Sequence, residues 1–204
     1  MLSQLDPQRL LMAQDAKRSF YAQAYDSKWL FVYQRDPGAL PVGALRNSAN
    51  AGCGEIICHW DDDDWSHPLR IAEQVALLES SGADAVGYDD MIFWDGAEAW
   101  QYFIRHPGKA LGTSLMYWTK TWERVPFQPF ASGEDTDWCG RVKVATASSI
   151  VDGVPRMIAR IHAGNARNPA YSLAERQKNA ALPYPLWQWR RAPEYDRTCK
   201  ETFL

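Results

Sequence analysis

The segment His59-Trp60-Asp61-Asp62-Asp63-Asp64-Trp65 sets four adjacent carboxylates between two tryptophans. An apolar run, Glu55-Ile56-Ile57-Cys58, leads directly into it, and Ser66-His67-Pro68 starts a helix directly after it. Like charges repel one another, so folding alone gives no reason to crowd four acids at the end of a buried strand. A divalent cation would neutralise them, and carboxylate oxygens suit Mg²⁺ or Mn²⁺, above all when phosphate completes the coordination shell. The segment therefore predicts chemistry on a metal-bound phosphate or diphosphate.

Spacing within the acidic run divides its members into two pairs. Asp61 and Asp63 are two residues apart, so an extended backbone would point both side chains to one side, where they can share an ion. Asp62 and Asp64 would then face elsewhere, toward backbone donors or the helix that follows. The alternative is a solvated acidic turn that caps this helix, since carboxylates are favoured near helix N-termini. One carboxylate would serve that purpose, which favours the metal site.

The bulk composition limits the classes of protein to which the chain can belong. Its 204 residues include 46% hydrophobic residues and carry a formal net charge of −3, which indicates a globular protein. The lack of a basic excess argues against a nucleic-acid-binding surface. No stretch approaches the ~18 consecutive apolar residues of a transmembrane helix. The four cysteines form no CxxC pair and have no zinc-site spacing, so reduced thiols and a cytoplasmic protein are expected.

Residue patterns predict alternating helices and strands through most of the chain. Helices are expected over residues 6–24, 43–51, 68–81 and, after a loop, within 133–144. Strands are expected over residues 28–33, 55–60, 83–88, 91–94, 113–118, 149–151 and 157–162. This alternation favours an α/β fold with a largely parallel sheet, in which ligands bind beyond the C-terminal ends of the strands. The acidic run lies at such an end.

The chain divides into a main domain and an extension. Residues 1–165 are expected to form the α/β domain. Residues 166–204 are rich in proline and polar side chains. We expect this extension to pack on the domain or to be partly disordered.

A second acidic pair lies in Gly133-Glu134-Asp135, where a helix is expected to begin. The two carboxylates could simply cap this helix. Alternatively, one of them could act as a general base, since a carboxylate held against a hydroxyl can take its proton as the oxygen attacks. The motif alone does not decide between these two interpretations.

Two groups of basic residues add to the acids. Arg46-Asn47 precedes the acidic strand, and a guanidinium suits phosphates and carboxylates. His162 lies in Arg160-Ile161-His162 near the end of the last expected strand. A histidine alone is more often structural than a ligand, but a neutral imidazole can complete a metal shell or contact a phosphate.

Taken in order, these groups resemble a family 2 glycosyltransferase of the GT-A type. The resemblance covers roughly residues 9–165 and is most specific at the acidic run and its flanks. Its motifs are Arg46-Asn47, Gly54-Glu55-Ile56-Ile57, Asp61 to Asp64 with Trp65, Pro68, Arg70-Ile71, Gln74, Leu77, Gly133-Glu134-Asp135, and Arg160-Ile161-His162 with Asn165. It implies a three-layer α/β/α sandwich with a mainly parallel central sheet.

The resemblance also implies an activity and a role for each motif. The activity is transfer of a sugar from a nucleotide-diphosphate donor, such as a UDP- or GDP-sugar, to a hydroxyl of an acceptor glycan, lipid or protein, with inversion at the anomeric carbon. The implied cofactor is Mn²⁺ or Mg²⁺. The residues implied are Asp61, Asp63 and His162 at the metal, with Asp63 the more direct ligand; Asp135 as base, with Glu134; and Arg46, Asn47, Asp61 and Asp62 at the donor.

The chain departs from the family pattern near its start. The first expected helix starts almost at Met1, so we expect a domain that lacks the family's first nucleotide-binding strand and is N-terminally shortened. The family's acidic turn after the second strand is also missing, because Tyr33 is followed by Gln34-Arg35-Asp36-Pro37. The alternatives are therefore an enzyme completed by oligomerisation, or an inactive or truncated relative that binds metal or nucleotide without turnover. A separate alternative is a metal-dependent phosphohydrolase or nucleotidyltransferase that uses the same acids.

Overall fold

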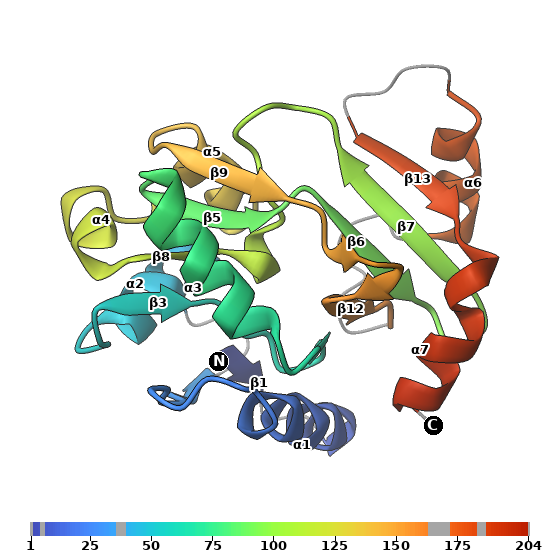
Figure 1. Ribbon diagram of the computed structural model, residues 1–204, viewed down its shortest axis with the longest axis horizontal. Helices are drawn as coiled ribbons and strands as arrows, with labels where there is room; N and C mark the ends of the chain where they lie inside the picture. The colour runs from blue at the N-terminus through green and yellow to red at the C-terminus, as the bar shows by residue number, and fades with distance from the viewer. Residues whose placement is uncertain (1, 5–6, 36–39, 163–171, 183–186, 204) are drawn as a thin grey trace.

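The computed structural model describes residues 2–4, 7–35, 40–162, 172–182 and 187–203. Two mixed sheets lie end to end, and the chain passes from one to the other where β5 (Ala85–Tyr88) is followed by β6 (Asp90–Trp94). Helices flank both sheets (Figure 1). The fold is therefore mixed α/β.

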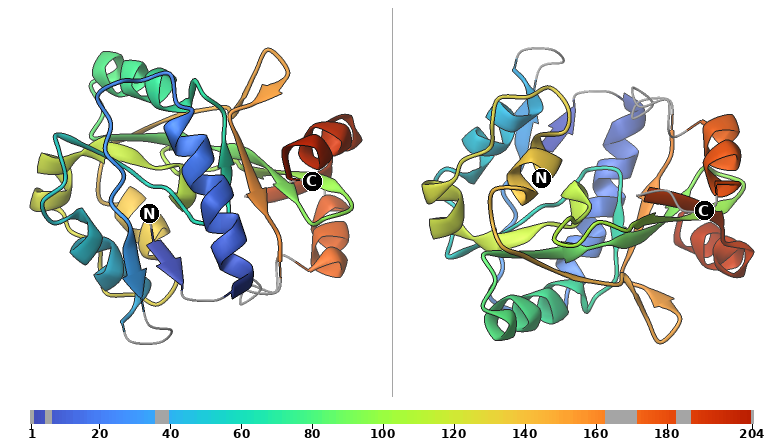
Figure 2. Two further views of the ribbon diagram at one scale, coloured as in Figure 1. Left: turned by 90° about the horizontal axis from the view of Figure 1, so that it is seen from below. Right: turned by 90° about the horizontal axis from the view of Figure 1, so that it is seen from above.

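The four-stranded sheet has the order β3-β8-β5-β9. Its other strands are β3 (Ile56–Cys58), β8 (Met116–Trp118) and β9 (Val144–Ala147). Strand β8 runs antiparallel to both of its neighbours, whereas β5 and β9 are parallel. Figure 2 shows α3 (Arg70–Ser81) on one face, and α2 (Val42–Asn50), α4 (Thr119–Arg124) and α5 (Glu134–Cys139) on the other. This sheet carries the acidic run, which directly follows β3.

The five-stranded sheet has the order β13-β7-β6-β12-β4. Its remaining strands are β13 (Trp187–Arg191), β7 (Ala99–Ile104), β12 (Met157–Arg160) and β4 (Trp65–Ser66). Of its pairs, only β12 with β6 is parallel. Helices α6 (Leu173–Ala180) and α7 (Asp196–Phe203), with the short 3-10 helix η3 (Pro193–Tyr195), lie at its outer end (Figure 1). Residues from the C-terminal extension thus supply an edge strand of this sheet.

Smaller elements complete the described structure. Strand β1 (Leu2–Gln4) pairs in parallel with β2 (Tyr33–Arg35), and helix α1 (Pro7–Tyr21) follows β1. A hairpin joins β10 (Ile150–Val151) to β11 (Val154–Pro155). The 3-10 helix η1 (Gly112–Ser114) precedes β8. In the described part of the chain, no helix is both long and apolar enough to cross a bilayer.

The sheets correct three expectations drawn from the sequence. A mainly parallel sheet is wrong, because connections such as residues 95–98 between β6 and β7 are too short for the crossover that parallel strands need. The strand expected over residues 28–33 forms only from Tyr33, since a strand-like composition needs a neighbouring strand to pair with. A strand, β1, does precede the first helix and pairs with β2 in a separate two-stranded sheet, so the expectation that no strand lies there is wrong.

The helix expected over residues 68–81 is confirmed as α3, and it anchors the core beneath the acidic run. Ile71, Val75 and Leu78 are buried on one side of α3 and pack in one cluster with Trp60. The helix ends at Gly82, whose φ of 59° is a left-handed conformation that glycine adopts at little cost. Trp60, the residue directly before the acids, is therefore held in place by its packing against α3.

Candidate functional site

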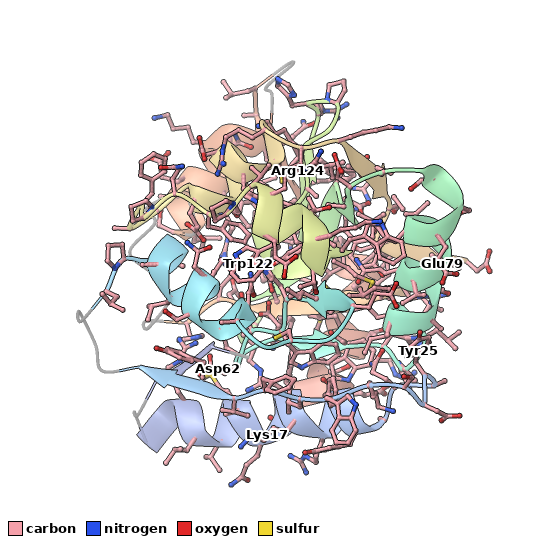
Figure 3. The ribbon with its side chains drawn as sticks, turned by 90° about the vertical axis from the view of Figure 1, so that its left-hand side faces the viewer. Lys17, Tyr25, Asp62, Glu79, Trp122 and Arg124 are labelled. Atoms are coloured by element: carbon pink, nitrogen blue, oxygen red, sulfur yellow. The ribbon has the colours of Figure 1, made fainter. Side chains whose placement is uncertain are left out.

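The acidic run forms a buried turn between β3 and β4, not an extended strand. Asp62 is 1% exposed, and Asp63 and Asp64 are each 8% exposed. In Figure 3, Asp62 lies between helices α1 and α2. Such burial argues against a solvated helix cap, because ionised carboxylates are rarely buried unless a cation or hydrogen bonds compensate them.

Arg70 of α3 holds both ends of this turn from inside the protein. Its Nη1 donates to Ser66 Oγ at 2.9 Å, and its Nη2 donates to the carbonyl oxygen of His59 at 2.9 Å. The guanidinium also lies 4.8 Å from the ring centroid of Trp60. A side chain that is 1% exposed and so fully bonded fixes where the turn begins and ends.

Three of the four carboxylates gather at one place. Asp61, Asp63 and Asp64 each offer one oxygen, and these oxygens all lie within 4.8 Å of one another. Asp62 instead pairs with Arg9 of α1. The expected meeting of Asp61 and Asp63 is therefore seen, but Asp64 joins them, because the alternation of an extended strand does not apply in a turn.

The positive charges near this trio offset its negative charge only in part. Burial, followed by repulsion from Asp63 and Asp61, raises the pKa of Asp64 well above its usual range. Burial also raises the pKa of Asp61, although the charge of Arg46 opposes that rise. For Asp63, a hydrogen bond from His162 and the charge of Arg9 outweigh burial and lower the pKa. Three converging oxygen donors with this shortage of cations fit Mg²⁺ or Mn²⁺.

The end of β12 brings His162 to the trio, as the order of the motifs predicted. His162 Nε2 lies 3.0 Å from Asp63 Oδ2, so it donates to the ionised carboxylate. The backbone amide of Arg160 donates to Asp64 Oδ1 over 3.3 Å. In a neutral imidazole with Nε2 protonated, Nδ1 keeps the lone pair. Whether His162 binds the metal itself or orients Asp63 stays a prediction.

Arg46 links the acidic turn to the second acidic pair. Its Nε donates to Glu134 Oε1 at 2.9 Å, and both side chains are at most 10% exposed. Burial alone would lower the pKa of Arg46, but the charges of Asp61, Glu134 and Asp135 together raise it. Arg46 therefore balances charge on both sides, and Glu134 is a buried ion-pair partner rather than a free base.

Asp135 lies beside the 3-10 helix η1, which also contacts the acidic turn. An ideal Cβ on Gly112 would lie 2.1 Å from Asp135 Oδ2, so the carboxylate packs where Gly112 has no side chain. The next residue, Thr113, donates through Oγ1 to Asp64 Oδ2 at 2.7 Å. Asp135 Oδ1 accepts the amide of Thr136 at 2.7 Å, and the side chain is half-buried. Gly112 and Thr113, two adjacent residues of η1, thus connect Asp135 to the trio of Asp61, Asp63 and Asp64.

Asn47 is not brought to this group. Its Oδ1 accepts from the Trp122 indole at 2.9 Å and from the Phe127 amide at 3.0 Å, while its Nδ2 donates to the Phe127 carbonyl oxygen at 2.8 Å. These bonds tie α2 to α4 and to the loop after it. Asn47 therefore has a structural role in holding α2 in place, and its side chain is turned to different partners from those of Arg46.

A cavity of about 560 Å³ runs along β3 and ends at the acidic turn. Arg46, His59 and Asp61 line the end at the turn, and residues 29–31, Trp-Leu-Phe, line it farther out. The volume falls in the range of small-molecule sites. Sequence reasoning missed these aromatic residues as pocket walls because their apolar run predicted an ordinary strand.

Arg9, Asp64 and Thr113 are the other contributors that sequence reasoning missed. Arg9 meets Asp62 across 53 residues of chain, and no local pattern signals such a contact. Thr113 was expected only as the start of a strand. For Asp64, the recognition that four consecutive acids form a turn would have sufficed.

Comparison with solved structures shows similarity to TarS of S. aureus. Its residues 1–349 in complex with UDP match at a TM-score of 0.57 and 13% identity, covering 78% of this chain and 60% of that one. The complex with UDP-GlcNAc matches at a TM-score of 0.59 and 13% identity, covering 80% and 59%. The chain thus spans about three fifths of the matched TarS chains. At this identity the similarity shows the fold alone: the chain shares the fold of the matched part of TarS.

Comparisons of sequence add nothing further. No protein-family model matches the chain, and no curated protein matches it.

Proposed function

We propose that the protein is a metal-dependent glycosyltransferase that moves a sugar from a nucleotide-diphosphate donor to an acceptor hydroxyl with inversion. The observation that carries this proposal is the convergence of Asp61, Asp63 and Asp64 at the end of the cavity, with Asp135 joined to them through η1. TarS, whose fold is similar, was solved with UDP and with UDP-GlcNAc, which favours a UDP-sugar over a GDP-sugar as donor.

The acidic trio would hold Mn²⁺ or Mg²⁺. When bound, such an ion neutralises charge on the departing nucleoside diphosphate. Asp63 is held in its ionised form by His162 and Arg9. Asp61 lines the cavity and lies near Arg46, so it would help to hold the ion at the end of the cavity where the donor would bind.

The cavity would receive the nucleotide. Its inner end offers the Arg46 guanidinium, whose planar donors suit phosphate oxygens. Its outer end offers the aromatic faces of residues 29 and 31, against which a base can stack. A ligand in this position would place its diphosphate beside the acidic turn and its nucleoside along β3.

Asp135 would act on the acceptor. Its carboxylate takes the proton from the acceptor hydroxyl while that oxygen forms a bond to the anomeric carbon and the bond to the diphosphate oxygen breaks. Attack opposite the departing diphosphate inverts the anomeric centre. Glu134 cannot share this work easily, because its carboxylate is already paired with Arg46.

The test is release of nucleoside diphosphate from UDP- and GDP-sugars with Mn²⁺ or Mg²⁺, together with detection of a new glycoside. A glycoside made by the wild type and lost in Asp135→Asn would support the proposal. Binding of UDP and Mn²⁺ by calorimetry without any turnover would indicate a non-catalytic relative instead. Release of phosphate without a glycoside would indicate a phosphohydrolase.

A further inference from the structure

Arg9 reaches the acidic turn from helix α1, whereas Arg70 reaches it from helix α3. Arg9 lies in the first turns of α1, and its side chain is 12% exposed. Its Nη2 donates to both Asp62 Oδ1 and Asp63 Oδ2, the latter at 3.1 Å, and its Nε lies 3.4 Å from Asp62 Oδ2. One guanidinium therefore bridges two adjacent carboxylates of the turn.

The oxygen that Arg9 contacts on Asp63 is already in use. Asp63 Oδ2 is also the oxygen that lies 3.0 Å from His162 Nε2. A carboxylate oxygen has two lone-pair directions, so Arg9 and His162 together occupy both. A cation that approaches this oxygen must displace one of them or settle for the other oxygen of Asp63.

Asp62 provides the place to which Arg9 can withdraw. It is the most buried of the four acids at 1% exposure, and it stands outside the trio that converges within 4.8 Å. Its two oxygens both face Arg9. Asp62 can therefore keep Arg9 in place after the contact with Asp63 is given up.

We propose that Arg9 is a built-in counter-cation that competes with the metal for Asp63, with Asp62 as its anchor. In this role Arg9 is a positioning residue that sets metal affinity without touching the donor. The proposal rests on the proposed metal site, and it goes beyond that site by assigning opposite effects to Arg9 and Asp62. Removing Arg9 strengthens metal binding, because a positive charge beside the trio repels a dication. Removing the charge of Asp62 weakens it, because Arg9 then turns fully to Asp63.

The test is a calorimetric titration with Mn²⁺ alone, with no nucleotide or acceptor present. We expect Arg9→Gln to bind Mn²⁺ at least about tenfold more tightly than wild type, and Asp62→Asn to bind it several-fold more weakly. Arg9→Lys keeps the charge but not the planar fork, and should fall between wild type and Arg9→Gln. The matched control is Arg18→Gln, on the same helix, whose side chain is 78% exposed and pairs with Asp15; it should bind as wild type does.

Several outcomes overturn the proposal. If Arg9→Gln binds Mn²⁺ equally or more weakly, Arg9 does not compete with the ion. If Asp62→Asn binds Mn²⁺ more tightly, Asp62 is not the anchor, and this variant decides the matter even if Arg9→Gln does not fold. If wild type binds Mn²⁺ and Arg9→Gln leaves the affinity unchanged, the metal site stands and only the role of Arg9 fails. If no variant binds Mn²⁺ at millimolar concentration, the metal-dependent function fails as well.

Discussion

The acidic turn and the start of α5 hold buried carboxylates in opposite settings. In the turn, burial and mutual repulsion raise the pKa values of Asp61 and Asp64, and the nearby charge of Arg46 does not cancel the rise for Asp61. At the start of α5, Glu134 is matched by Arg46, and Asp135 accepts a backbone amide. Under the proposed function, this difference would suit the first group to a positive ion and leave Asp135 of the second group available to a substrate.

Of the changes that test this comparison, loss of Asp63 should have the largest effect on metal binding and turnover. Asp63→Ala removes one of three converging oxygens and the partner of His162, so Mn²⁺ affinity should fall by at least about 100-fold, since even an indirect partner of a metal ligand is worth 10- to 100-fold. Donor turnover should then be undetectable. Calorimetry with Mn²⁺ measures the first effect and nucleoside diphosphate release the second. The exposed Asp26→Ala is the control; equal loss in both variants would contradict a specific site.

Asp135→Asn should separate binding from chemistry. The amide keeps the size of the side chain beside Gly112 but cannot take a proton, so kcat should fall by about 10² to 10⁴. Affinity for Mn²⁺ and for UDP should change little, because Asp135 is outside the trio. Steady-state kinetics paired with calorimetry measure the two quantities. Full activity in this variant would show that another group is the base.

Glu134→Gln should act on stability. It leaves the buried Arg46 guanidinium without its carboxylate, and breaking one side of a buried pair typically costs about 3–5 kcal/mol. Urea unfolding monitored by tryptophan fluorescence measures the free energy of unfolding. Glu79→Gln, on the exposed side of α3 in Figure 3, is the matched control and should change it little. A loss of less than about 1 kcal/mol would mean that Asp61 and Asp135 already suffice to balance Arg46.

His59 should make a smaller, pH-dependent contribution to the free energy of unfolding. Burial, reinforced by the charge of Arg46, holds the pKa of His59 well below its ordinary value. The unfolded chain therefore takes up this proton first, so stability is present above pH ~6.5 and is lost as the pH falls below it, by at most about 1.4 kcal/mol per pH unit.

Comparison with a variant isolates that contribution from the titrating aspartates. In urea unfolding experiments, the free energy of unfolding of wild type relative to His59→Gln should decrease progressively as the pH falls from 7.5 to 5.5. A difference that stays constant with pH would place the proton-linked cost elsewhere.

The sequence predicted the parts of the fold and site that local patterns encode. The four acids after an apolar run and the glycine that ends α3 are local signals, and the order of the motifs added Glu134, Asp135 and His162. The structure places His162 against the acids, and Arg46 lies near both Asp61 and the Glu134-Asp135 pair. The direction of β8 was not predictable in this way, because strand pairing depends on contacts far apart in the chain. The contact of Arg9 with Asp62 escaped for the same reason.

Arg70 has a consequence for how the protein can be altered. Because it fastens the acidic turn to the interior, the inner end of the cavity inherits its shape from the core. The outer end does not, since Trp29 is 84% exposed and Phe31 is 53% exposed. Under the proposed function, attempts to redesign which nucleotide is accepted belong at Trp29 and Phe31, whose exposed side chains can be exchanged without disturbing the core.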